Sequence, residues 1–380
     1  MKKQIVYRGS LVLAMLLGVA IQVSAGEQWT AQKAQDWYGQ KGWAAGCNFT
    51  PSTAINQLEM WQAETFDSAT IDRELGWAQD IGFNAVRIFL HNIPWEEDKQ
   101  GFLKRIDQFL TIADKHHIKV IMVPLDAVWD PYPKAGKQRD PKPHVHNSGW
   151  VQSPGVEILK NPARHDELKG YIQGVISHFK DDQRILAWDM FNEPDNMNRP
   201  AYEAAEPANK AQLSLMLLKK AFAWAREINP SQPLTAGVWM GNWELADKLL
   251  PMEKFCLEQS DVISFHNYGN LEDMKKCVQN LKRYHRPVVC TEYMARPQGS
   301  RFDPILGYLK EEKVGAINWG FVNGKTQTIY PWDTWTKNYT AAPKVWFHDI
   351  FQQDGTPYDA KEVAYIKSVT LKNEVSSAKR

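Results

Sequence analysis

Two glutamates each follow a short apolar run of the kind that forms a buried strand. Glu193 comes two residues after the run 185–191, and Glu292 comes directly after the run 288–291. Two carboxyl groups that face one cavity can hydrolyse a glycosidic bond, because one protonates the leaving oxygen while the other stabilises or attacks the anomeric carbon. Hydrolysis with retained configuration needs the two groups roughly 5 Å apart. Glu193 and Glu292 are therefore the candidate catalytic pair.

Further polar and aromatic residues lie at or just beyond the ends of similar runs: Arg87, Asn192, His266, Tyr268 and Trp319. Each one alone could be an ordinary salt-bridge partner or core aromatic. Their joint placement at strand ends argues against chance. We expect Arg87 to pair with Glu292, to lower the pKa of its carboxyl group and to keep it ionised as a nucleophile must be. A hydrogen bond from Tyr268 to Glu292 would have a similar effect.

The elements that must position these residues alternate regularly along the chain. Amphipathic helical patterns with a period of 3.6 residues separate the apolar runs, as in Phe102, Ile106, Phe109 and Ala113. Eight runs are predicted to be strands: 42–49, 85–90, 119–125, 185–191, 234–238, 262–266, 288–291 and 316–320.

This alternation predicts an α/β protein, specifically a single-domain (β/α)8 TIM barrel. Eight apolar strands, each followed by a helix, match a closed parallel barrel that is buried on both sides. A doubly wound sheet is the alternative, but no G-x-G-x-x-G motif follows the first strand. In a barrel the strand ends that carry the candidate residues share the catalytic face.

At these residues the chain is similar to the retaining glycoside hydrolases of clan A, most closely family 5, the cellulase and mannanase type. The resemblance covers about residues 42–346, and its most specific elements are Asn192-Glu193-Pro194 and Glu292. It implies that Glu193 is the acid/base, that Asn192 binds the sugar 2-hydroxyl, that Glu292 is the nucleophile and that no cofactor is needed. The family usually has a histidine at the end of the third strand, whereas this chain has the segment Pro124-Leu-Asp126-Ala-Val-Trp129, so the substrate subgroup stays open.

Two long connections follow predicted strands and are expected to wall the cleft. They span residues 126–164 and 322–343, whereas ordinary connections in such folds have about 2 to 6 residues. We expect them to restrict the cleft to short substrates or chain ends. Residues in them that could contact sugar are Asp126, Trp129, Trp332 and Trp335, with Trp150 and Tyr330 as further loop aromatics.

Two other classes of function remain compatible with the sequence. A barrel whose loops prevent productive binding would be a catalytically weak carbohydrate-binding protein, although the presence of both glutamates argues against this. A metal-dependent barrel hydrolase is the third class. His144 and His146 resemble a metal-binding pair, but no third ligand lies at suitable spacing nearby, so we predict no metal site.

Composition limits the partners of the chain. Its 45 basic and 44 acidic residues give a formal charge of +1, which makes nucleic acid an unsuitable partner. The 16 Trp, 13 Tyr and 15 Phe residues supply flat apolar faces that suit stacking on sugar rings. A carbohydrate is therefore the expected partner, and we expect a monomer.

The N-terminal segment is expected to be a signal peptide. Basic residues at 2, 3 and 8 precede a short apolar run over 11–20, and small residues before position 26 form a cleavage site. The apolar run is too short for the roughly 20 residues of a membrane span. We therefore expect residues 1–25 to be removed, and residues 26–380 to form a secreted or periplasmic catalytic domain that does not bind membranes.

The four cysteines are too few to form a disulfide scaffold for a chain of this length. Cys256 and Cys277 flank one strand and helix unit, and a bridge between them is possible. Cys47 and Cys290 lie in apolar runs and are predicted to be buried thiols.

Overall fold

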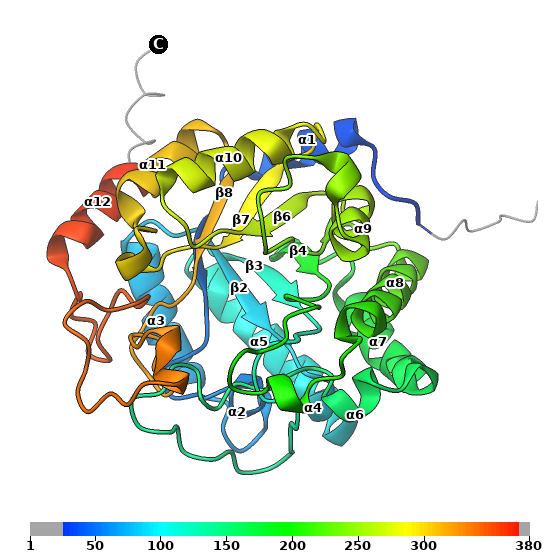
Figure 1. The fold of residues 1–380 in the computed structure, drawn as a ribbon, viewed down its shortest axis with the longest axis horizontal. Coiled ribbons are helices and arrows are strands. Elements are labelled where there is room, and N and C mark those ends of the chain that lie inside the picture. The colour runs from blue at the N-terminus through cyan, green and yellow to red at the C-terminus, as the bar shows by residue number, and fades with distance from the viewer. Residues whose placement is uncertain (1–25, 372–380) are drawn as a thin grey trace, which may run out of the picture.

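The computed structural model describes residues 26–371, which form a ring of parallel strands surrounded by helices (Figure 1). The strands are hydrogen bonded in the order β5-β4-β3-β2-β1-β8-β7-β6. Their bounds are Ala45–Asn48 for β1, Ala85–Phe89 for β2, Lys119–Val123 for β3, Ile185–Asp189 for β4, Leu234–Thr235 for β5, Ile263–His266 for β6, Val288–Glu292 for β7 and Gly315–Asn318 for β8.

The ring closes between β5 and β6 through residues beyond the end of β5. Val238 forms a parallel bridge with Phe265, and its backbone nitrogen donates to the Ser264 oxygen at 3.1 Å. Strand β5 is shorter than predicted because the Ala236 nitrogen donates to the Ser260 hydroxyl group at 3.1 Å instead of to a strand. The predicted (β/α)8 barrel is confirmed.

Helices cover the outside of the barrel, with short 3-10 turns in the loops. The α-helices are α1 Ala31–Lys41, α2 Gln57–Trp61, α3 Ser68–Asp80, α4 Asn92–Glu97, α5 Lys99–Lys115, α6 Val156–Leu159, α7 Lys169–Phe179, α8 Lys210–Ile228, α9 Pro251–Gln259, α10 Leu271–Lys282, α11 Phe302–Glu311 and α12 Ala360–Thr370. The 3-10 turns are η1 Pro162–Leu168, η2 Glu203–Ala205, η3 Ala246–Lys248, η4 Arg296–Gln298 and η5 Trp332–Trp335.

Helix α5 shows how the sequence pattern leads to this packing. Asp98 caps its first turn by accepting a hydrogen bond from the Gly101 nitrogen at 2.9 Å. The predicted apolar positions Phe102, Ile106 and Phe109 are fully buried against the barrel. The 3.6-residue period therefore identified the buried face correctly.

The two long loops at the carboxyl end of the barrel bind each other. The Asn147 nitrogen donates to the Thr326 oxygen at 2.8 Å, and the His146 nitrogen donates to the Thr334 hydroxyl group at 3.0 Å. The first loop is shorter than predicted, because helix α6 and turn η1 occupy its second part. The loops that follow β3 and β8 thus form one joined wall.

All four cysteines are buried free thiols, so Cys256 and Cys277 are not bridged, while Cys47 and Cys290 are buried as predicted. Within residues 26–371 no helix is both long and apolar enough to cross a membrane. The predicted signal peptide, residues 1–25, lies outside the described residues.

Candidate active site

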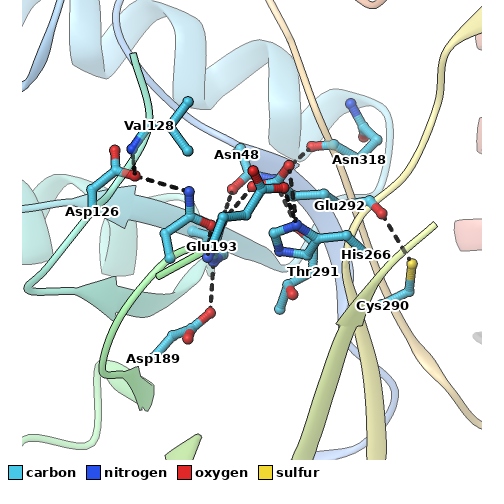
Figure 2. A network of polar contacts seen from close by, with 12 residues as sticks. Asn48, Asp126, Val128, Asp189, Glu193, His266, Cys290, Thr291, Glu292 and Asn318 are labelled. Atoms are coloured by element: carbon cyan, nitrogen blue, oxygen red, sulfur yellow. Dashed lines mark hydrogen bonds and ion pairs between the residues drawn. The ribbon is translucent and has the colours of Figure 1, made fainter. Parts of the chain in front are cut away.

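Glu193 and Glu292 meet at the carboxyl end of the barrel (Figure 2). Glu292 is the last residue of β7, and Glu193 lies four residues beyond the end of β4 with a positive φ of 40°. One carboxylate oxygen of each lies within 4.8 Å of the other and of a ring nitrogen of His266. His266 Nδ1 is 2.8 Å from Glu193 Oε1 and 3.5 Å from Glu292 Oε2. This spacing fits a retaining pair of carboxyl groups.

Arg87 organises the floor of this site from β2. Its side chain is fully buried and donates to Asp189 Oδ2 at 2.9 Å and to Glu292 Oε1 at 3.0 Å. It also donates to Asn48 Oδ1 at 2.8 Å and to Asn192 Oδ1 at 2.8 Å. One guanidinium group therefore holds four strand-end residues in fixed positions.

The net pKa of Glu292 differs from the sequence-based expectation. Burial raises its pKa above the usual value, and nearby His266 and Arg87 only partly oppose this rise. Tyr268 Oη donates to Glu292 Oε2 at 2.7 Å, as the sequence suggested, and this bond also favours the ionised form. Arg87 lowers the pKa of Glu292 as predicted, but the cost of removing the carboxylate from water outweighs this effect.

Burial also raises the pKa of Glu193, to about 7. Desolvation is the main cause of this rise, and the charge of Asp195 contributes further. Burial lowers the pKa of His266 to about 4, so its ring is neutral near pH 7. Near neutral pH, Glu193 can therefore hold a proton that it can also release.

Asp126 supports the site from behind. Its buried carboxylate accepts hydrogen bonds from Asn192 Nδ2 at 2.9 Å, Trp150 Nε1 at 2.6 Å and Gln57 Nε2 at 2.9 Å. It is 0% exposed and does not line the cavity. Asp126 therefore orients the Asn192 amide, whereas the sequence suggested direct contact with sugar.

A cavity of about 430 Å³ opens above the two glutamates. Of the residues predicted to contact substrate, Asn192, His266, Tyr268, Trp129, Trp319 and Trp332 line it. Trp335 does not; it stacks on Trp129 at 5.3 Å between ring centroids and supports that side of the cavity from behind. Arg87 is fully buried and does not line the cavity.

His144 and His146 do not act as a pair. His144 is hydrogen bonded to the Tyr330 hydroxyl group, and His146 Nδ1 is bonded to the Tyr330 backbone oxygen at 2.8 Å. Among residues 26–371, neither belongs to a cluster of three groups with metal-ligand spacing. His146 instead lines the cavity.

Several residues of the site escaped the sequence analysis. Asn48 ends β1 and donates to the Thr291 oxygen at 2.8 Å, and Asn196 donates to Glu193 Oε2 at 2.7 Å. Trp239 lines the cavity and donates to Asp195 Oδ1 at 2.7 Å. Asn48 and Asn196 could have been found, because one lies next to the end of a predicted strand and the other lies three residues after Glu193.

Comparison with known proteins agrees with this geometry. A family model described as cellulase (glycosyl hydrolase family 5) matches residues 44–325. The putative mannan endo-1,4-β-mannosidase 4 of Arabidopsis thaliana is 26% identical over 160 residues, which make up 40% of this chain and 37% of that protein. The match thus spans well under half of that relative.

Two solved structures have a similar fold. The endo-1,4-β-mannanase of Rhizomucor miehei has a TM-score of 0.56 at 16% identity, covering 86% of this chain and 94% of that one. The exo-β-1,4-mannosidase of Opitutaceae bacterium strain TAV5 has a TM-score of 0.56 at 17% identity, covering 87% of this chain and 60% of that one. At these identities the likeness concerns the fold alone.

Proposed function

The chain belongs to glycosyl hydrolase family 5, and from this we propose that it hydrolyses β-glycosidic bonds with retention, using Glu292 as nucleophile and Glu193 as acid/base. The observation that carries the proposal is the pair itself. The two carboxyl groups approach within 4.8 Å, and only Glu292 receives hydrogen bonds from both Arg87 and Tyr268. Those donors favour an ionised nucleophile.

The reaction follows from these positions in two steps. Glu292 attacks the anomeric carbon while Glu193 protonates the leaving oxygen, so the glycosidic bond breaks and a glycosyl ester forms. Glu193, now ionised, removes a proton from water, and the water oxygen replaces Glu292 at the anomeric carbon. Asn192 faces the cavity with its amide fixed by Arg87 and Asp126, as a group that binds a sugar hydroxyl must be.

We propose a β-mannoside as the substrate, in the form of short chains or chain ends. The name of the sequence relative supports the sugar, since it is a putative mannan endo-1,4-β-mannosidase. The joined loop wall supports short substrates, because its two loops bring Trp129 and Trp332 to the cavity and are hydrogen bonded to each other. Export directed by residues 1–25 and a monomeric state belong to the same proposal.

Covalent labelling tests the nucleophile. A 2-deoxy-2-fluoro-β-mannoside with an activated leaving group should label Glu292. The fluorine slows both steps, whereas the activated leaving group speeds only the first step, so the glycosyl ester accumulates. Peptide mapping identifies the labelled residue. A label on another carboxylate would contradict the assignment.

Azide rescue tests the acid/base. Glu193→Ala should still react with an activated aryl β-glycoside, whose leaving group needs no proton, and azide should then restore turnover as the glycosyl azide. Exposed Glu64→Ala is the matched control and should behave as the unchanged enzyme. Failure of azide to restore turnover would contradict the role of Glu193.

Two simple measurements separate the other classes of function. Loss of activity on adding a chelator would indicate a metal-dependent hydrolase. Binding of oligosaccharides without turnover, on a panel of aryl β-glycosides, would indicate a carbohydrate-binding barrel.

A further inference from the structure

The segment that follows Glu193 holds an amide in a fixed orientation against the carboxyl group. Asn196 Nδ2 donates to Glu193 Oε2 at 2.7 Å. Its other amide atom, Oδ1, accepts a hydrogen bond from the Asn198 backbone nitrogen at 2.8 Å. Because a backbone nitrogen can only donate here, the oxygen of the amide must face Asn198 and the NH2 group must face Glu193.

A buried lysine holds this segment in place. Lys210 is the first residue of α8. Its Nζ atom donates to the backbone oxygen of Asn196 at 2.6 Å, to the backbone oxygen of Ala127 at 3.0 Å and to Glu206 Oε1 at 2.8 Å. The side chains of Lys210 and Glu206 are both 0% exposed. All three ammonium hydrogens thus have acceptors, one of which is in the loop after β3 and one in the segment after Glu193.

Glu206 extends the same network across the two loops. Its Oε1 atom also accepts from Gln152 Nε2 and Asn198 Nδ2, both at 2.6 Å. Asn198 Oδ1 in turn accepts from the Trp129 nitrogen at 2.7 Å. A buried ion pair contributes little net stability compared with apolar residues of the same volume, so stability alone does not account for this arrangement.

We infer that Asn196, held by the Lys210–Glu206 ion pair, is a positioning residue that fixes the carboxyl group of Glu193 in the orientation needed for proton transfer. This inference rests on the proposed function, in which Glu193 protonates the leaving group. Without Asn196 and Lys210, the buried carboxyl group would keep its proton more tightly and release it less readily to the leaving oxygen.

Some of the charged and titratable groups around Glu193 raise its pKa, and others lower it. Those that face it are Arg87 from β2, Asp195 from its own loop, Lys210 from α8, His266 from β6, Tyr268 from the following loop and Glu292 from β7. Burial raises the pKa of Glu193 most, and Asp195 raises it further. The Asn196 hydrogen bond, Arg87 and Lys210 lower it. Removal of Asn196 or Lys210 should therefore raise this pKa.

The experiment is the pH dependence of kcat/KM for an aryl β-mannoside whose leaving group needs protonation. Activity falls at high pH when Glu193 loses its proton, so the alkaline limb reports the pKa of Glu193. Asn196→Ala and Lys210→Met should each move this limb upward, Asn196→Ala by about one pH unit, as expected for loss of a hydrogen bond to a charged group. Asn196→Ala should also slow substrates with poor leaving groups more than activated ones.

Two controls separate this role from loop packing. Asn338→Ala removes an exposed amide of the same type and should leave the limb unmoved. Asn198→Ala weakens the same loop network but leaves its backbone nitrogen and Asn196 in place, so it should lower kcat/KM without moving the limb. If Lys210→Met does not fold, the alkaline limb of Asn196→Ala is compared with those of Asn338→Ala and Asn198→Ala, and this comparison alone tests the inference.

An unmoved alkaline limb in Asn196→Ala would overturn the inference, as would an equal shift in Asn198→Ala. The proposed function would survive either result if azide still restores turnover to Glu193→Ala. If azide does not restore turnover to Glu193→Ala, the assignment of Glu193 as acid/base is wrong, whether or not the alkaline limb moves in Asn196→Ala. The two failures are thus distinguishable.

Discussion

Glu193 and Glu292 share one buried cavity but have different hydrogen-bond partners. Glu292 receives hydrogen bonds from Arg87 and Tyr268, whereas Glu193 receives one from Asn196 and contacts the neutral ring of His266. Burial raises the pKa of both groups, so these partners decide which one ionises first. The neighbours of each carboxyl group therefore set its role.

Tyr268→Phe should lower kcat/KM by about 10- to 100-fold, because it removes a hydrogen bond to the charged form of Glu292. Without this donor the pKa of Glu292 rises further, so the acid limb of the pH profile should move upward. Tyr132→Phe, at a tyrosine that is 49% exposed, is the control. An acid limb that stays in place would show that Tyr268 does not influence the pKa of Glu292.

Glu193→Gln should stabilise the protein at pH 8 but not at pH 4. Its folded-state pKa of about 7 lies above the ordinary value of 4.5, so the stability from the protonated form is present below pH 4.5 and is lost as pH rises through 7. Glutamine has no proton to lose. The gain in the free energy of unfolding at pH 8 should be on the order of 1.4 kcal/mol per unit of pKa difference, and at most about 3.5 kcal/mol.

Thermal or urea unfolding of Glu193→Gln and the unchanged protein at both pH values gives this difference. Glu64→Gln, at an exposed position, should show no such pH-dependent gain. Equal stability of Glu193→Gln and the unchanged protein at pH 8 would mean that burial does not raise the pKa of Glu193.

The sequence indicated the strand-end residues but not those that support them. Arg87, Glu193 and Glu292 stand out because their residue types interrupt apolar runs. Lys210 gave no such signal, because a lysine in the first turn of an amphipathic helix is usually exposed. It is buried only because the loops after β3 and β4 fold over it, and such contacts between distant segments leave no local pattern.

The loops after β3 and β8 act as one unit through contacts between their backbones and aromatic rings. Trp335 stacks on Trp129, while Trp332 packs edge-on against Tyr268 at 5.0 Å between ring centroids. The length and aromatic content of these loops were evident in the sequence. Which rings face the cavity was not, because it depends on how the two loops pair.

Trp332→Ala and Trp335→Ala should therefore have different effects. Trp332→Ala should cost about 1 to 3 kcal/mol of transition-state binding, measured from kcat/KM, because it removes a ring from the cavity wall. Trp335→Ala should affect kcat/KM less and thermal stability more, because its ring supports Trp129 from behind. Trp77→Ala, on α3 outside the cavity, is the control. A larger loss of kcat/KM in Trp335→Ala would place that ring against the substrate.

The strand and helix pattern predicted the barrel well because apolar periodicity records which faces are buried. Its errors occur at element ends. Strand β5 was predicted over 234–238 but ends at Thr235, where a side-chain hydroxyl group replaces a strand partner. This replacement of a strand partner depends on Ser260, which lies outside the apolar run. The end of β5 therefore cannot be predicted from the residues of the run alone.

The molecule as a whole combines a (β/α)8 barrel with a wall that the loops after β3 and β8 form beside the cavity. If this wall blocks one end, cleavage should favour chain ends and short oligosaccharides. Incubation with soluble β-mannan should then release reducing sugar steadily while viscosity falls slowly. A rapid fall in viscosity with little reducing sugar would indicate an open cleft and internal cleavage.

The four buried, unpaired cysteines give the protein an internal reporter of its own unfolding. A thiol reagent cannot reach them until the chain opens, so labelling should be slow and should accelerate with denaturant as the open population grows. Because no disulfide joins them, dithiothreitol should leave the melting temperature unchanged. Fast labelling of a cysteine in native buffer would mark a segment that opens without global unfolding.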